Sequence, residues 1–259
     1  MMARNGDVVL GWDEQGSGDT LLLIHGLGYA RWGWEPLLPL LDGHFRVISF
    51  DNRGIGDSSV PPGPYDAAQM AGDALAVLDD AGVERAHVVG TSLGGMIAQE
   101  VALAAPGRVD RLVLIATNPG TPHAYPMPET TVRLLTEAPA WDPAVALRRF
   151  VENALGPAPD AGIVERILEH RTSQPQSPDG WAAQAAAGTT FHGGDRARGI
   201  TAPTLLISGE EDRVVDPRNT TLLGEMIPES TTSLIADAGH LVFWEHPRTV
   251  ADRIIDFLT

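Results

Sequence analysis

Gly90-Thr91-Ser92-Leu93-Gly94 is the stretch that decides the fold, because it joins a strand-like segment at 85–89 to a helix-like segment at 95–104. A serine on a sharp strand-to-helix turn, with glycine two positions before and two after, is the pattern of a nucleophile elbow. Such a turn strains the serine backbone, and a Cβ at either flanking position would collide with the neighbouring strand or helix. The pattern predicts that Ser92 is a nucleophile beside a helix N-terminus, whose N–H groups favour an oxyanion.

Strand-like and helix-like segments alternate on both sides of this turn. Short apolar runs predict buried strands, and apolar residues at helical spacing predict helices. The predicted strands are 8–12, which we expect at a sheet edge, and 20–24, 45–50, 85–89, 111–116, 202–208 and 231–236. The predicted helices are 32–41, 67–81, 95–104, 217–227 and 248–258. This alternation predicts an α/β fold, with helices flanking a mostly parallel twisted sheet.

The alternation stops after Asn118-Pro119-Gly120. Beyond it no strand pattern is convincing until about residue 200, and Pro- and Gly-rich breaks separate helix-like segments at 129–136, 143–154, 161–171 and 181–187. We expect a core domain made of 1–120 and 200–259, with 121–199 inserted as a helical cap. The 259-residue length suits one α/β domain that carries such an insertion.

Composition and charge argue against several classes of partner and of catalytic chemistry. The formal charge is −16, from 34 acidic and 18 basic residues. Nucleic acids and anionic membranes repel such a protein, so we expect neither as a partner. The chain has no lysine for a Schiff base and no cysteine for a thiolate nucleophile or metal site. Its eight histidines show no metal-ligand spacing, so we expect no metal and no cofactor.

Hydropathy indicates a location away from membranes. No run approaches the roughly 18 apolar residues of a membrane span. Residues 1–7 lack the apolar region of a secretory signal, so we expect a cytoplasmic protein. The sequence leaves the oligomeric state open, a homo-oligomer included.

A serine hydroxyl needs a neighbouring base, and the base needs an acid that orients it. Since the carboxyl ends of parallel strands meet at one sheet edge, the partners of Ser92 should follow other strands. Asp212 follows the strand at 202–208, and His240 follows the strand at 231–236. We predict that these two residues are the acid and the base.

Other residues compete for the same two roles. Glu210, Glu211 and Asp216 share the loop of Asp212, and His246 follows His240 closely. We favour Asp212 because an acid two or three residues past such a strand turns inward. His246 precedes Pro247, and we expect it to begin the last helix.

Four motifs in this order resemble the α/β-hydrolase superfamily across nearly the whole chain. They are His25-Gly26-Leu27-Gly28, Asp51-Asn52-Arg53-Gly54-Ile55-Gly56-Asp57-Ser58, Gly90-Thr91-Ser92-Leu93-Gly94-Gly95 and Ala238-Gly239-His240. The chain order of nucleophile, acid and histidine is also the order of that superfamily. Residues 121–199 resemble its variable helical cap. Within the superfamily the chain is similar to small bacterial esterases, enol-lactonases of the 3-oxoadipate type and cofactor-free haloperoxidase or perhydrolase relatives.

The resemblance implies an oxyanion hole made by the backbone N–H groups of Leu27 and Leu93. A tetrahedral intermediate needs both donors, and losing one costs about 10²–10³ in rate. We expect the His25 side chain to be structural, within a tight turn.

Two departures narrow the resemblance. Ser92 stands where haloalkane dehalogenases and epoxide hydrolases of this fold carry aspartate, which argues against both activities. Ile55 stands where the enol-lactonases carry the histidine of a D-x-R-G-H-G segment, which weakens that assignment. We expect the segment from Asp51 to Asp57 to shape a loop, with Arg53 in a structural ion pair.

The cap and neighbouring loops should determine the substrate, which we expect to be a small molecule. The candidate pocket lining is apolar and aromatic: Leu27, Trp32, Trp34, Trp141, Trp181, Phe191, Val242 and Phe243. Such a lining favours an apolar or aromatic acyl or alcohol group. Cap arginines could instead clamp a substrate carboxylate, and the candidates are Arg133, Arg148, Arg149, Arg166 and Arg171.

These observations predict a serine hydrolase that cleaves a carboxylic ester or lactone through an acyl-enzyme intermediate. An alternative keeps the triad but carries out perhydrolysis, haloperoxidase-type chemistry or cleavage of a carbon–carbon bond. A third reading is a ligand-binding protein of this fold with little turnover.

Overall fold

The computed structural model describes all 259 residues and contains one eight-stranded sheet. The strands are β1 (Met2–Asn5), β2 (Val8–Gly16), β3 (Thr20–Ile24), β4 (Arg46–Phe50), β5 (Ala86–Thr91), β6 (Val109–Ile115), β7 (Thr204–Gly209) and β8 (Ser230–Ile235). Their order in the sheet is β1-β2-β4-β3-β5-β6-β7-β8. The strands from β4 to β8 are parallel, and β1 and β2 pair antiparallel at one side.

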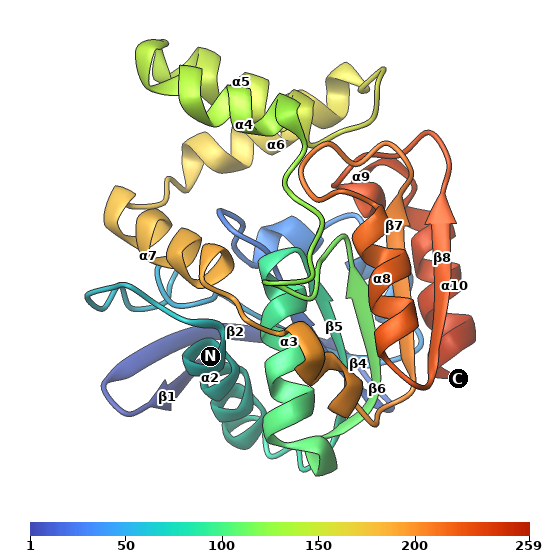
Figure 1. Ribbon diagram of the computed structural model, residues 1–259. Coiled ribbons are helices and arrows are strands. Elements are labelled where there is room, and N and C mark those ends of the chain that lie inside the picture. The colour runs from blue at the N-terminus through green and yellow to red at the C-terminus, as the bar shows by residue number, and fades with distance from the viewer.

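Helices cover both faces of this sheet, so the central strands are buried on both sides (Figure 1). The helices α2 (Ala67–Asp80), α3 (Leu93–Ala104) and α8 (Arg218–Met226) share one hydrophobic core with one face. The helices α1 (Leu38–Leu41), α9 (Val242–Glu245) and α10 (Pro247–Leu258) share a second core with the other face. Apolar burial of this extent is the main stabilising term in folding, at roughly 25 cal/mol per Å².

Between β6 and β7 the chain forms only helices and loops. Its helices are α4 (Glu129–Glu137), α5 (Pro143–Asn153), α6 (Ala161–Ser173) and α7 (Pro178–Thr189), with 3₁₀ turns η3 (Ala138–Ala140) and η4 (Gly194–Gly199). Figure 1 shows α4 to α7 above one end of the strands, while η4 lies beside α3. From this arrangement we propose the division into a core of 1–120 and 200–259 and a helical cap of 121–199. None of the helices combines the length and apolar character that crossing a membrane requires.

Two predicted elements differ from the structure. The segment at 8–12 is not an edge strand, since β2 extends to Gly16 and pairs with both β1 and β4. The edge is β1, whose four residues lack an apolar run. The predicted helix at 32–41 is divided into a 3₁₀ turn η1 (Arg31–Trp34) and the short α1. Pro36 and Pro39 explain the interruption, because proline lacks the N–H that a continuous helix needs.

The first turn of α3 lies directly against the end of β3. A Cβ placed on Gly94 would be 2.0 Å from the carbonyl oxygen of Ile24 and 2.7 Å from that of His25. A Cβ on Gly90 would be 2.3 Å from the carbonyl oxygen of Gly94. Both glycines of the elbow are therefore required by backbone contact.

We expect Gly94→Ala to destabilise the fold by at least about 3 kcal/mol, because the clash is with backbone that cannot rotate away. Gly107→Ala is the matched control, since a Cβ there has no neighbour within 4 Å. Urea unfolding of both variants measures the difference. Equal free energies of unfolding for the two variants would show that the contact between α3 and the end of β3 does not require glycine at position 94.

Candidate active site

Ser92 lies between β5 and α3 in a conformation that L-residues rarely adopt. Its backbone φ is 55° and its ψ is −121°. The Ser92 N–H donates to the carbonyl oxygen of Ile115 at 2.9 Å, and Oγ1 of Thr117 donates to the carbonyl oxygen of Ser92 at 2.8 Å. Strain of this kind costs about 1–3 kcal/mol and persists only where surrounding contacts impose it. These contacts hold Ser92 in the strained conformation at the end of a central strand.

Asp212 and His240 meet at the end of the same sheet, past β7 and β8. The Nδ1 atom of His240 lies 2.8 Å from Oδ2 of Asp212, and both side chains are buried. The other carboxylate oxygen of Asp212 accepts the N–H groups of Val214 and Val215 at 2.7 and 2.9 Å. The carboxylate is thereby fixed, and the imidazole directs Nε2 away from Asp212. Nε2 makes no hydrogen bond within the protein.

The competing residues take other places. Asp216 pairs with Arg218 at 2.5 Å, and this partner lowers the pKa of the Asp216 carboxyl. His246 immediately precedes α10, as expected. Of the residues considered for the acid and the base, Asp212 and His240 are the two that the structure brings together.

The loop after β3 lies against Ser92. A Cβ on Gly26 would be 2.9 Å from Cβ of Ser92 and 3.5 Å from its Oγ. The N–H groups of Leu27 and Leu93 donate to no protein acceptor. One unpaired backbone N–H thus lies on the loop next to Ser92, and another lies at the start of α3.

His25 belongs to an aromatic cluster beneath this loop. Its ring stacks on Tyr29 with centroids 4.7 Å apart, and it contacts Trp34 and Phe243 at 4.8 and 5.8 Å. Burial is the main cause that lowers the pKa of His25 to about 3. The ring is neutral at ordinary pH and packs as an aromatic side chain, consistent with the expected structural role.

The Asp51–Asp57 loop is held by charge pairs, with Arg53 in the expected ion pair. Arg53 makes two hydrogen bonds to the buried carboxylate of Asp73, at 2.6 and 2.7 Å. Asp51 accepts the N–H groups of Arg31 and Asp57 at 2.7 and 2.9 Å. Burial raises the pKa of the Asp51 carboxyl, and these hydrogen bonds oppose the rise.

The residues expected to line a pocket do not all gather at one place, although Trp32, Trp34 and Phe243 belong to the aromatic cluster around His25 and Tyr29. Trp34, Val242 and Phe243 are fully buried in the core below the site, and Phe191 is buried in the core on the other face of the sheet. Trp181 is 39% exposed on α7. Trp141 stacks with Arg149, and Trp32 stacks with His170. Sequence spacing could not separate packing from lining, because both favour large apolar side chains.

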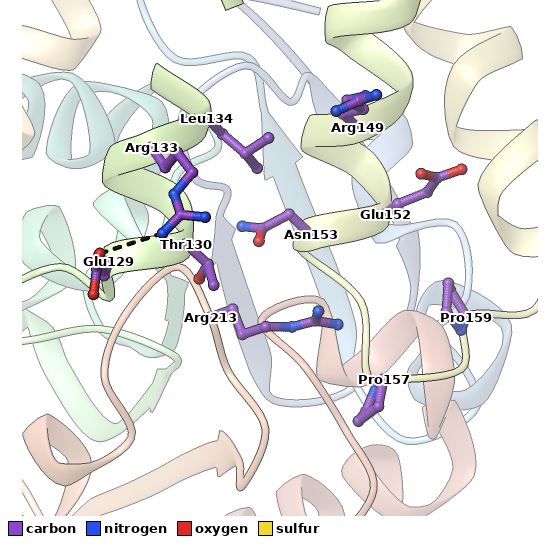
Figure 2. A pocket seen from close by; sticks show the side chains of 10 residues that line it. All are labelled: Glu129, Thr130, Arg133, Leu134, Arg149, Glu152, Asn153, Pro157, Pro159 and Arg213. Carbon is purple, nitrogen blue, oxygen red and sulfur yellow. Dashed lines mark hydrogen bonds and ion pairs between the residues drawn. The ribbon is translucent and has the colours of Figure 1, made fainter. Parts of the chain in front are cut away.

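Two cavities are prominent, and neither includes Ser92. The larger, about 610 Å³, lies between α4, α5 and the loop after β7 (Figure 2). Arg133, Arg149 and Arg213 line it together with Glu129 and Glu152. The second, about 490 Å³, is lined by Trp32, Glu35 and His170 among others. No cluster of three His, Asp or Glu side chains is placed to hold a metal ion.

Two residues near the site were not predicted from the sequence. Thr117 follows β6 at the same sheet edge as Ser92, and a polar residue just past a buried strand is the signal that could have identified it. Gln184 on α7 is buried, donates to the carbonyl oxygen of Arg53 at 2.7 Å and accepts the N–H of Gly28 at 3.5 Å. No local pattern marks Gln184, because the two core groups that it binds are more than 100 residues away.

His25 should make the protein sensitive to acid. Its pKa is about 3 when folded and about 6.5 in an unfolded chain, so the unfolded state binds more protons between these pH values. Stability therefore falls as the pH decreases from about 6.5 toward 3. Between pH 7.5 and 5.0 the loss attributable to His25 should be about 2 kcal/mol.

The free energy of unfolding in urea should be measured for His25→Phe at both pH values. Its decrease between pH 7.5 and 5.0 should be about 2 kcal/mol smaller than in the unmodified protein, whatever the absolute stability of the variant. His44→Gln, at an exposed histidine, is the control and should keep the original dependence. An unchanged dependence in His25→Phe would contradict the depressed pKa.

Known proteins with similar sequence or structure include several hydrolases and a putative non-heme bromoperoxidase of Mycobacterium tuberculosis, which is 30% identical over 96% of this chain and 97% of its own length. The family model described as alpha/beta hydrolase fold matches residues 19–247. A 2-hydroxy-6-oxononadienedioate/2-hydroxy-6-oxononatrienedioate hydrolase of Cupriavidus pinatubonensis is 31% identical, over 95% of this chain and 89% of its own length.

Solved structures agree with this match. A hydrolase from Pseudomonas aeruginosa superposes with a TM-score of 0.87 at 31% identity, covering 100% of this chain and 97% of its own. The enol-lactonase from Burkholderia xenovorans superposes with a TM-score of 0.85 at 27% identity, covering 100% and 99%. The matched family, the relative and the eight-stranded fold agree, and the chain belongs to the α/β hydrolase family.

Proposed function

We propose that this protein is a serine hydrolase that cleaves a carboxylic ester or lactone with Ser92, His240 and Asp212. The single observation that carries the proposal is the fixed Asp212–His240 pair at the same sheet edge as the strained Ser92. The similarity to an enol-lactonase and to other hydrolases supports it.

In the proposed reaction, Ser92 Oγ attacks the substrate carbonyl while Nε2 of His240 takes its proton. Asp212 accepts the Nδ1 hydrogen, which fixes the tautomer and stabilises the imidazolium that forms. The oxyanion receives hydrogen bonds from the N–H groups of Leu27 and Leu93. His240 then protonates the leaving alcohol or enol, and an acyl group remains on Ser92.

The second half repeats the sequence with water as the nucleophile. His240 removes a proton from water, the resulting hydroxide attacks the acyl carbon, and the second tetrahedral intermediate collapses to a carboxylic acid. Ser92 recovers its proton from His240. In a lactone the leaving hydroxyl stays attached, so one ring-opened product is released.

The relative from Cupriavidus favours a second candidate. It is named a hydrolase of 2-hydroxy-6-oxononadienedioate, a substrate that contains a ketone and no ester. The same three residues could act on a carbon–carbon bond in this chain. Turnover of such a dienoate without turnover of any simple ester or lactone would favour this candidate, and peroxide-dependent turnover in acetate buffer would favour perhydrolysis.

Replacement of the proposed triad should abolish turnover of short p-nitrophenyl esters. We expect Ser92→Ala and His240→Gln to lower kcat by at least about 10³-fold and Asp212→Asn by about 10³–10⁴-fold. Steady-state rates are compared with Ser17→Ala and His44→Gln, which alter exposed residues of the same types. Full activity in Ser92→Ala would refute the proposal.

A fluorophosphonate probe gives an independent readout. The probe should form one adduct, at Ser92, and His240→Gln should slow its formation. Labelling at another serine would show that Ser92 is not the nucleophile. Labelling at Ser92 without turnover of any ester or lactone would support a binding protein of this fold.

A further inference from the structure

Arg171 extends from the last turn of the cap helix α6 to the loop after β3. A Cβ on Gly28 would be 3.1–3.3 Å from Nη1, Nη2 and Cζ of this guanidinium. The guanidinium also lies over the ring of Tyr29, with Cζ 5.3 Å from the ring centroid. A cap cation is thus seated on the same loop that carries Leu27 and its unpaired N–H.

Arg171 has no carboxylate partner, unlike most cap arginines. Arg133, Arg148 and Arg166 pair with Glu129, Glu165 and Glu35. Arg149 also lacks an ion pair, but it stacks on Trp141 and lines the larger cavity. In a chain with 34 acidic residues, a half-buried arginine without an acidic neighbour is a position where an anion from outside would be stabilised.

Most donors of Arg171 are available. A guanidinium has five N–H donors, and the neighbouring Tyr29 hydroxyl can accept only a minority of them. Tyr29 is itself buried and stacks on His25, so this platform is rigid. A planar, held guanidinium suits two parallel hydrogen bonds to a carboxylate.

The subsite is close to the reacting atoms. Gly26, which contacts the Ser92 side chain, and Gly28, which contacts Arg171, are two residues apart on one loop. Two residues of chain span at most about 7 Å, so a short acyl chain can reach from Ser92 to Arg171. Gln184 accepts the N–H of Gly28 and braces this part of the loop against α7.

We propose that Arg171 binds a carboxylate of the substrate and so selects acyl groups that end in a second, negatively charged carboxylate. The inference rests on the proposed function, because it places the reacting carbonyl at Ser92. It names the substrate class as monoesters or lactones of dicarboxylic acids. Of the two kinds of acyl group that the sequence left open, apolar or carboxylate-bearing, it selects the second.

The decisive comparison uses two esters that differ in one terminal group, mono-p-nitrophenyl adipate and p-nitrophenyl hexanoate. The unmodified protein should favour the adipate ester in kcat/KM. Arg171→Gln should lower kcat/KM for the adipate ester roughly ten- to a hundredfold, as expected for a charge-assisted pair, and change the hexanoate value less than about threefold. Arg171→Lys should recover part of the loss.

The matched control is Arg148→Gln, which removes a cap charge that already has a carboxylate partner. It should leave the ratio of the two kcat/KM values unchanged. If Arg171→Gln lowers both esters in parallel, Arg171 only positions the cap and the proposal is wrong. An unchanged ratio in Arg171→Gln would also overturn it.

A binding measurement separates failure of this inference from failure of the proposed function. Calorimetric titration of Ser92→Ala with adipate and with hexanoate needs no turnover. Adipate should bind at least about tenfold more tightly than hexanoate, and Ser92→Ala/Arg171→Gln should lose that preference. If neither ester is hydrolysed but the preference is found, the subsite stands and the proposed reaction fails; without the preference, the subsite fails.

Discussion

The close approach of α3 to the end of β3 is the constraint on which the site depends. At Gly94 the helix backbone comes so near the carbonyl groups of Ile24 and His25 that no side chain fits between them. This contact brings the first turn of α3, which carries the N–H of Leu93, and the loop of Leu27 close to one serine. It also fixes the strained backbone of Ser92, since a relaxed turn would move the helix off the strand. Contacts of the main chain supply this geometry.

Much of the core could be predicted from the sequence, because its signals are local. Buried parallel strands are continuous apolar runs, and the turns after them carry the glycines and polar residues of the site. The strand at 20–24 agrees fully with β3, and the α/β class is confirmed by the eight-stranded sheet. The edge strand was misplaced because Met2–Asn5 has no apolar pattern of its own. It pairs only with β2 and gains its place from that neighbour.

The roles of the candidate pocket tryptophans and of the cap arginines could not be predicted in the same way. Trp34 and Trp181 have the same residue type, yet one is fully buried and the other is exposed. The arginines are equally alike in sequence, and only the fold shows that Glu35 neutralises Arg166 while Arg171 reaches Gly28. Contacts between segments more than 100 residues apart set these differences. The ion pair of Arg53 was easier to predict from the sequence, since a buried arginine requires a carboxylate partner.

Gln184 links the cap to two loops of the core. Its side-chain amide joins α7 to two core loops at once, donating to the Arg53 carbonyl and accepting the N–H of Gly28. Lifting α7 would break both hydrogen bonds and leave a buried carbonyl and a buried N–H without partners, each at a cost of about 1–3 kcal/mol. The helix α7 and the loop that carries the N–H of Leu27 are therefore linked. In the proposed reaction, lifting α7 to admit a substrate would also disturb the proposed oxyanion donor on that loop.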